Sequence, residues 1–430
     1  MLFAALAAAA AVSFAAGHPP TLLLTPCDPQ GVPAGCGTLR VPENRARPGG
    51  RTIGLHVVVV PARHQPSPAD AFTYLSGGPG GAATQEIGEI VEIFAPVHEH
   101  QDIVLVDQRG TGSSHPLRCP PQVSLRACVE RVPGDLTQYG SEAAADDLDA
   151  VREALGYAQL DVYGVSYGAT LAQVYLKRHR GHVRTLVLDG ATFLDVPFYD
   201  AFAQSAQRAL DRLAARCAAS PACARAYPRW RRAFTRLVHG RADGNEIAGI
   251  VQQMLLDPQE TAKIPYVVAR AAAGDMKPLR SESPAQLFSR QLMFWSVWCN
   301  EPWVGLQAAG PWHTDFDGFT QTALRDYRRW CAELPRRPEP AAAWTLPRTQ
   351  VPLLVLAGGA DPQDPLRNVS GLRWFFPNAR AIVVPEYGHG VAEYGCVSGL
   401  VSLFVDRASA GGLDARCVRA IRPPPFVLPR

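Results

Sequence analysis

A serine on a glycine-flanked turn is the residue of this sequence best suited to chemistry. The stretch 164–168 reads Gly-Val-Ser-Tyr-Gly, with a short apolar run before it and apolar residues at helical spacing after it. Small residues are needed on both sides of so sharp a strand-to-helix turn, because larger side chains would collide with the neighbouring backbone. The following helix directs its amide end towards negative charge. The pattern predicts that Ser166 is a nucleophile, although a helix-capping serine has the same local sequence.

A serine hydroxyl becomes a strong nucleophile only when a base takes its proton and a third group orients that base. The chain supplies candidates in the order serine, acid, histidine, which is the order typical of this kind of sheet. Asp361 follows an apolar run at 352–356, and His389 lies in a Gly-His-Gly stretch after the run at 381–384. Because both follow strands, we expect them at the same sheet edge as Ser166. They are the predicted acid and base of a catalytic triad.

Three other acids could orient the histidine, namely Asp364, Asp189 and Glu386. Asp189 better fits a turn that ends a strand. Glu386 lies too close to His389 in sequence for an easy sideways approach. Asp361 is therefore preferred.

Attack on a carbonyl creates an oxyanion, which two backbone amides must already face. The amide of Tyr167, directly after the nucleophile, is one candidate. The second is expected in the loop that reads Gly-Gly-Pro-Gly-Gly at 77–81, where Gly78 is the preferred donor. The later stretch 107–114 has a phosphate-loop appearance but lacks the Gly-Lys-Ser/Thr ending. Its Asp107 and Arg109 are predicted to brace the floor of the site.

Apolar strand patterns alternate with helical patterns in the first half of the chain, which indicates a mostly parallel, doubly wound α/β sheet. From about 193 to 345 the strand pattern gives way to helical segments. We therefore expect an inserted helical cap over the carboxyl ends of the strands, where such sheets bind ligands. The expected division is a signal peptide at 1–16, sheet core at 17–192, cap at 193–345 and sheet core at 346–430. The strand patterns lie at 36–41, 52–60, 71–75, 103–106, 160–165, 185–188, 352–356 and 381–384.

The apolar, alanine-rich opening resembles the hydrophobic part of a secretory signal, although it lacks a basic start. No other run approaches the ~20 apolar residues of a membrane helix. The chain has 42 basic and 39 acidic residues and no basic run, so a nucleic-acid partner is not indicated. These features predict a secreted or periplasmic protein without an integral membrane segment. The oligomeric state has no signature in the sequence.

The ten cysteines fall into couples that are close in sequence. None forms a Cys-x-x-Cys pair or has a histidine at ligand spacing, so metal binding is not indicated. We expect up to five disulfides, typical of an oxidising compartment. The couples are Cys27 with Cys36, Cys119 with Cys128, Cys217 with Cys223, Cys299 with Cys331, and Cys396 with Cys417.

Several motifs together resemble the exported α/β-hydrolase aminopeptidases, the relatives of proline iminopeptidase and tripeptidyl aminopeptidase. The motifs are Gly-Gly-Pro-Gly-Gly, Asp-Gln-Arg-Gly-Thr-Gly, Gly-Val-Ser-Tyr-Gly, the Leu-Asp-Gly at 188–190 and the late Gly-His-Gly. The resemblance implies the α/β-hydrolase fold, a Ser166–His389–Asp361 triad, cleavage near a free peptide N-terminus, a helical cap and no cofactor. One departure is Ser76, where proline iminopeptidases commonly have histidine before the glycine loop.

A peptidase that selects free N-termini needs an anion to meet the substrate ammonium group, preferably in a partly buried site. Glu301 is the candidate, with Trp298 and Trp303 as walls and a Cys299–Cys331 bridge as support. A solvated glutamate beside packing tryptophans remains the alternative. Asp315 and Asp317 are further candidate anions.

The sequence therefore predicts a serine peptidase that acts on the N-termini of peptides through an acyl-enzyme. A carboxylesterase with the same triad and an apolar pocket is the nearest alternative. A non-catalytic binding protein on a hydrolase scaffold is the alternative from another class. The sequence leaves open whether one residue or a tripeptide is released.

Overall fold

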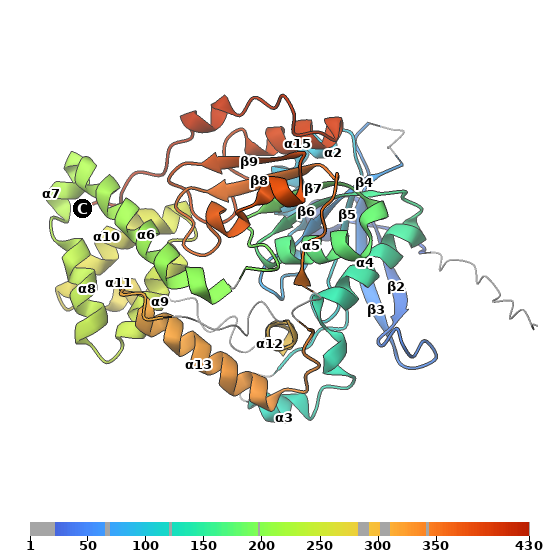
Figure 1. Ribbon diagram of the computed structural model, residues 1–430, viewed down its shortest axis with the longest axis horizontal. Coiled ribbons are helices and arrows are strands. Elements are labelled where there is room, and N and C mark those ends of the chain that lie inside the picture. Colours follow the sequence, from blue (N-terminus) through green and yellow to red (C-terminus); the bar gives the residue numbers. More distant parts are fainter. Residues whose placement is uncertain are drawn as a thin grey trace, which may run out of the picture.

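The computed structural model describes residues 22–64, 69–119, 123–196, 198–282, 292–301, 310–340 and 344–429 (Figure 1). In this part of the chain nine strands form one sheet. The strands are β1 (Thr25–Cys27), β2 (Ala34–Pro42), β3 (Thr52–Val60), β4 (Ala71–Leu75), β5 (Ile103–Val106), β6 (Leu160–Val165), β7 (Val183–Asp189), β8 (Leu353–Gly358) and β9 (Ala379–Val384). The α-helices are α1 (Ile87–Ile93), α2 (Ala95–His98), α3 (Leu125–Val129), α4 (Ser141–Leu155), α5 (Tyr167–Arg178), α6 (Phe198–Ala219), α7 (Pro221–Ala226), α8 (Trp230–Gly240), α9 (Gly244–Met254), α10 (Pro258–Ala272), α11 (Lys277–Ser281), α12 (Leu292–Asn300), α13 (Asp317–Glu333), α14 (Leu372–Phe375) and α15 (Val397–Arg407).

The strand order is β1-β2-β3-β5-β4-β6-β7-β8-β9. Strands β1, β2, β3 and β5 pair antiparallel, whereas every pair from β5 through β9 is parallel. The prediction of a mostly parallel, doubly wound sheet is confirmed, and each predicted strand pattern overlaps a strand. The short strand β1 was not predicted, because its three residues include a proline and a cysteine and show no alternation.

Helices cover both faces of the sheet, so the parallel strands are buried on each side (Figure 1). On one face α4 and α5 pack against the strands through residues such as Leu148, Val151 and Leu171. On the other face α1, α2 and α15 contribute Ile90 and Phe404, among others. Burial on both faces explains why β6, β7 and β8 have nearly continuous apolar sequences rather than alternating ones.

The chain between β7 and β8 contains helices α6 to α13, and its described residues include no strand, as the sequence predicted. These helices belong to two packing groups. Helices α6 to α11 have a core of their own, which includes Leu210, Phe234 and Val251. Helix α12 instead packs Leu292 and Trp295 into the core on the face of the sheet that α4 and α5 cover. The predicted insert at 193–345 thus includes helices that share the core of the sheet.

All five predicted disulfides are present, and no cysteine is free. The bonded cysteines are between 6 and 32 residues apart in sequence. The segment 1–16, predicted to be an export signal, lies outside the described residues. Within the described residues, none of the helices combines the length and the apolar character that crossing a membrane requires.

The loop after β5 is held by buried charges, in agreement with the bracing role predicted for it. Arg109 is fully buried and donates hydrogen bonds of 2.6 Å to both carboxylate oxygens of Asp147 on α4. Its third nitrogen, Nη1, donates to the carbonyl oxygens of Glu43 and Gln138. The guanidinium therefore ties the β5 loop, the β2–β3 turn and α4 together.

We predict that Arg109→Met lowers the free energy of unfolding by about 3–5 kcal/mol, because it leaves a buried Asp147 and two carbonyls without their main donor. Urea denaturation would measure the loss. Arg126→Met is the matched control, since Arg126 is 79% exposed in an ion pair with Glu130 and should cost less than about 0.5 kcal/mol. Equal losses in the two variants would contradict the role given to Arg109.

Candidate active site

Ser166 lies on a strained turn between β6 and α5, as its glycine-flanked sequence predicted. Its backbone has φ 57° and ψ −126°, and its amide donates to the carbonyl oxygen of Asp189 at 2.9 Å. A Cβ on Gly164 would lie 2.2 Å from the carbonyl oxygen of Gly168, and one on Gly168 would lie 1.9 Å from that of Leu75. Only glycine fits at both positions, because real Cβ atoms do not approach backbone oxygens so closely. The turn thereby presents the hydroxyl at the N-terminus of α5.

His389 and Asp361 form a hydrogen-bonded pair at the carboxyl edge of the sheet. Nδ1 of His389 lies 2.9 Å from Oδ2 of Asp361. The other carboxylate oxygen of Asp361 accepts the backbone amides of Gln363 and Asp364 at 2.8 and 2.9 Å. Burial opposes the charged carboxylate, but the nearby histidine and these amides hold the pKa of Asp361 below its usual range. Asp361 is thus an ionised acid in a position to fix the tautomer of His389.

The loop that carries His389 is held by Asp189, the last residue of β7. The carboxylate of Asp189 accepts the amides of Val391 and Ala392, at 2.8–3.0 Å, and the hydroxyl of Tyr163 at 2.8 Å. A Cβ on the following residue, Gly190, would lie 2.7 Å from the histidine ring. Asp189, considered as an alternative acid, therefore binds the backbone of the histidine loop rather than its ring nitrogen.

The ring of His389 favours the protonated form. Burial alone would lower the pKa of His389, but the carboxylates of Asp361 and Asp364 outweigh that effect and raise it to about 9. Its Nε2 atom is buried and has no hydrogen-bond partner among the described residues. Hydrogen bonds to catalytic bases are often long before substrate binds. In the neutral form of the ring, this unpaired Nε2 is the nitrogen that could accept a proton.

Two backbone amides near Ser166 fit the predicted oxyanion site. Gly78 has φ +120° and follows the close approach of Gly77, whose Cβ would lie 3.1 Å from that of Ser166. Tyr167 is the first residue of α5. Among the hydrogen bonds of the described residues, neither amide donates to a protein acceptor. Both residues line the same cavity as Ser166.

The cavity beside Ser166 has apolar and acidic walls. Trp298, which stacks on Phe294 at 4.5 Å between ring centroids, forms part of the apolar wall of this cavity, whereas its predicted role beside Glu301 stays a prediction. Asp364 and Gln363 form a polar wall that sequence reasoning did not place there. The lining residues are Gly78, Ser166, Tyr167, Thr170, Thr192, Phe193, Leu194, Trp298, Gln363 and Asp364.

Glu301 is buried rather than solvated, with an exposed fraction of 2%. Its Oε1 accepts the backbone amide of Ser141 at the start of α4, at 2.8 Å. The Ser141 hydroxyl lies 2.8 Å from the hydroxyl of Tyr167. Glu301 is therefore placed behind Tyr167 and is not among the residues that line the Ser166 cavity. The solvated alternative is wrong, whereas amine binding by Glu301 stays a prediction.

Among the other candidate residues, Asp315, Asp317 and Glu386 have partners away from the Ser166 cavity. Trp303 lies outside the described residues. Asp315 pairs with Arg231 at 2.8 Å, and Asp317 accepts the amides that precede α13. Glu386 pairs with Arg212 of α6 at 2.6 Å.

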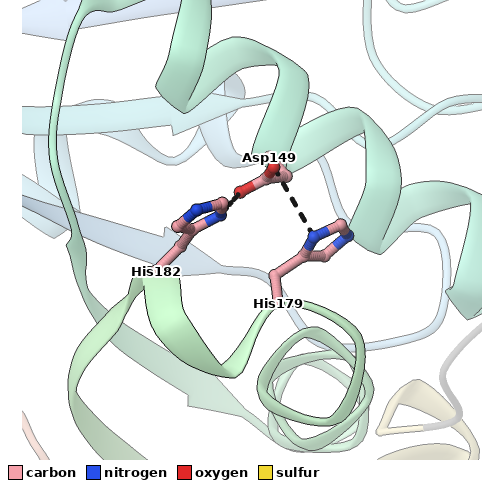
Figure 2. A group of neighbouring side chains, drawn as sticks. All are labelled: Asp149, His179 and His182. Carbon is pink, nitrogen blue, oxygen red and sulfur yellow. Dashed lines mark hydrogen bonds and ion pairs between the residues drawn. The ribbon is translucent and has the colours of Figure 1, made fainter.

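One group of side chains in the described structure has the composition of a metal site. Asp149, His179 and His182 face one another between α4 and the end of α5 (Figure 2). The Asp149 carboxylate, however, already pairs with Arg152 at 2.9 Å and accepts from His182 at 2.6 Å. Since an adjacent guanidinium opposes a metal cation, we assign this cluster to holding α4 against α5.

We predict that Gly168→Ala destabilises the protein by more than about 3 kcal/mol, because the new methyl group would overlap the carbonyl of Leu75 on β4. Gly399→Ala is the matched control: Gly399 lies in α15 with no atom near its Cβ position, so it should gain about 0.5–1 kcal/mol. Thermal denaturation would compare the two variants. A neutral Gly168→Ala would contradict the tight packing of α5 against β4.

Comparison with known proteins adds to this geometry. A profile of the alpha/beta hydrolase fold matches residues 70–395. The serine protease Hip1 of Mycobacterium tuberculosis is 31% identical over 241 residues, which cover 46% of this chain and 45% of that protein. Carboxylesterase B of the same organism is 35% identical over 224 residues, with 44% and 43% covered. Tripeptidyl aminopeptidase of Streptomyces lividans is 31% identical over 188 residues, with 36% and 35% covered.

The chain spans less than half the length of these curated relatives. Among solved structures, a proline iminopeptidase from Mycobacterium smegmatis aligns with 86% of this chain and 98% of its own, at 17% identity and a TM-score of 0.43. The profile match extends from β4 to the loop beyond His389, over more than half of the chain. This protein belongs to the alpha/beta hydrolase fold family.

Proposed function

We propose that this protein is a serine hydrolase in which Ser166, His389 and Asp361 form a catalytic triad. The main observation in support is the 2.9 Å contact between Nδ1 of His389 and Oδ2 of Asp361. This pair lies at the same sheet edge as Ser166 on its strained turn. The free Nε2 of His389 supports its role as the base.

In this mechanism Nε2 of His389 accepts the Ser166 proton as Oγ attacks the substrate carbonyl. The amides of Gly78 and Tyr167 stabilise the oxyanion, at about 3 kcal/mol of barrier each. The protonated histidine then gives its proton to the leaving amine, which leaves an acyl-enzyme. Water enters, loses a proton to the same nitrogen and releases the product acid. Asp361 remains ionised throughout and holds the tautomer of His389.

For the substrate, we propose peptides with a free N-terminus. The motif resemblance and the relatives named serine protease and tripeptidyl aminopeptidase favour peptide bonds. Trp298 would contact the side chain of the substrate, and Glu301 is the anion predicted for its amine. The apolar wall of the cavity would equally suit an ester, and one relative is named a carboxylesterase. A carboxylesterase is therefore the second candidate.

The five disulfides support function in an oxidising compartment, either secreted or periplasmic. We also propose that residues 193–345 act as a cap over the site. The supporting contact is the hydrogen bond of 2.8 Å from the amide of His389 to the carbonyl of Leu256, between α9 and α10. The cap would thus be in direct contact with the histidine loop.

We predict that the protein hydrolyses aminoacyl coumarylamides and acts at least tenfold more slowly on the N-acetylated compounds, measured as kcat/KM by fluorescence. Ser166→Ala should abolish both activities, whereas Ser113→Ala, which removes an exposed hydroxyl, should not. Equal rates on free and acetylated substrates would favour the carboxylesterase. Full activity of Ser166→Ala would remove the proposed nucleophile.

We predict that kcat/KM for p-nitrophenyl acetate rises with pH and reaches a plateau above about pH 9. The neutral imidazole is the base, and the raised pKa of His389 keeps it protonated and inactive below that value. This ester has no titrating group in the range, so the profile reports the free enzyme. A profile already flat from about pH 7 would contradict the control of His389 by its two acids.

A further inference from the structure

A second carboxylate, that of Asp364, faces the catalytic histidine and the cavity of Ser166. Its Oδ2 lies 3.8 Å from Nδ1 of His389, and the residue is part of the cavity wall. Only 5% of Asp364 is exposed. The triad itself needs one acid, and Asp361 holds the closer position at 2.9 Å. Asp364 is therefore a buried charge that the proposed mechanism does not use.

The carboxylate is fixed in place by neutral donors. Oδ1 accepts the hydroxyl of Thr192, which in turn accepts the side-chain amide of Asn368 at 2.7 Å. Oδ2 accepts the side-chain amide of Gln363 at 3.0 Å. These contacts set the orientation of the carboxylate without neutralising it, since hydroxyl and amide groups carry no net charge. The site is built to present an anion.

The charges around this anion do not balance. Asp361 and Asp364 share one cation, His389, and no lysine or arginine of the described residues forms an ion pair with either acid. A buried charge without a full partner is costly. Burial and the nearby Asp361 accordingly raise the pKa of Asp364 to about 6. A cation entering the cavity would relieve this imbalance.

We propose that Asp364 binds the α-ammonium group of the substrate, so that the enzyme releases one N-terminal residue at a time. This inference rests on the proposed peptidase function and names the group that selects the substrate. It replaces Glu301, which lies behind Tyr167, with an acid that lines the cavity itself.

The position of Asp364 sets the length of the released fragment. Each residue between the scissile carbonyl and the ammonium moves that ammonium by up to ~3.5 Å in an extended chain. An acid that contacts the catalytic imidazole can reach the ammonium of the residue being cleaved. The ammonium of a tripeptide unit would lie two residues further away. Single-residue release follows from this spacing.

Binding of the substrate ammonium group would also change the pKa of His389. Three acids act on the His389 ring: Asp361 and Asp364 from the loop after β8, and Asp189 from the end of β7. Neutralising Asp364 with a substrate cation removes one of the charges that favour imidazolium. The pKa of His389 would fall in the complex, and the neutral base would become available near neutral pH. A substrate without the ammonium would leave His389 protonated.

The first test uses the unmodified protein. A fluorophosphonate labels the nucleophile, and L-alaninamide should slow this labelling, whereas N-acetyl-L-alaninamide should protect at least tenfold more weakly. Protection by L-alaninamide should weaken roughly fivefold or more from about pH 7 to about pH 5, as Asp364 takes up a proton. Alanyl coumarylamide should be a better substrate than its trialanyl analogue. A pH-independent protection or a preference for the tripeptidyl substrate would overturn the proposal.

The second test compares isosteric variants. Asp364→Asn should reduce the ratio of kcat/KM for free over acetylated substrates roughly 10- to 100-fold, as expected for the loss of one charged hydrogen bond. It should also move the pH profile for p-nitrophenyl acetate to lower pH. Asp195→Asn, at an exposed acid nearby, is the control and should leave the ratio within about twofold. Glu301→Gln tests the rival ammonium site. Fluorophosphonate labelling of each variant checks that the site is intact.

The outcomes separate this inference from the proposed function. If the ratio of kcat/KM for free over acetylated substrates falls in Asp364→Asn alone, this result supports Asp364 as the ammonium site. A ratio that survives in Asp364→Asn, or is lost only in Glu301→Gln, overturns this inference and leaves the aminopeptidase intact. Absence of any free-amine preference in the unmodified protein overturns the aminopeptidase itself.

Discussion

The close approach of helix α5 to strands β4 and β6 is the constraint on which the rest of the site depends. Gly164 and Gly168 lie so near backbone oxygens that no side chain fits at either position. This contact forces the positive φ of Ser166 and fixes where its hydroxyl emerges. The proposed oxyanion donors depend on the same contact, because Tyr167 begins the helix and a Cβ on Gly77 would lie 3.1 Å from that of Ser166. The close packing of Gly164 and Gly168 thus determines the position of the Ser166 hydroxyl.

The other two members of the proposed triad follow strands β8 and β9, which run parallel to β6 in the sheet. Strands β6, β7, β8 and β9 are adjacent in the sheet, so their carboxyl ends deliver Ser166, Asp189, Asp361 and His389 to one edge. Asp189 has a positioning role in this arrangement, since it binds the amides beyond His389. Asp189 thus binds backbone amides, whereas the carboxylates of Asp361 and Asp364 lie 2.9 and 3.8 Å from Nδ1 of the His389 ring.

Much of this could be predicted from the sequence, because strand patterns, chain order and glycine positions are local signals. The disulfides and the strands rest on such signals, as do the proposed triad and the proposed oxyanion loop. The burial of Glu301 and the place of Asp364 could not be predicted, because both depend on which distant segments meet. Asp364 lies in the same loop as Asp361. Nothing nearby in sequence indicates that the hydroxyl of Thr192 will donate a hydrogen bond to its carboxylate. The split packing of α6–α11 and α12 is equally tertiary in origin.

The pairing of β7 with β8 has a consequence for how proteins of this fold diversify. These strands are adjacent in space but separated by roughly 160 residues, and the entropic cost of closing a loop grows only with the logarithm of its length, about 0.6 kcal/mol per doubling. A connection of half or twice this length would change the free energy of folding of the sheet only slightly. Because α6–α11 bury their own apolar surface, they could be exchanged without opening the core below. The sheet edge that carries Ser166 and the helices α6–α11 can accordingly change independently of each other.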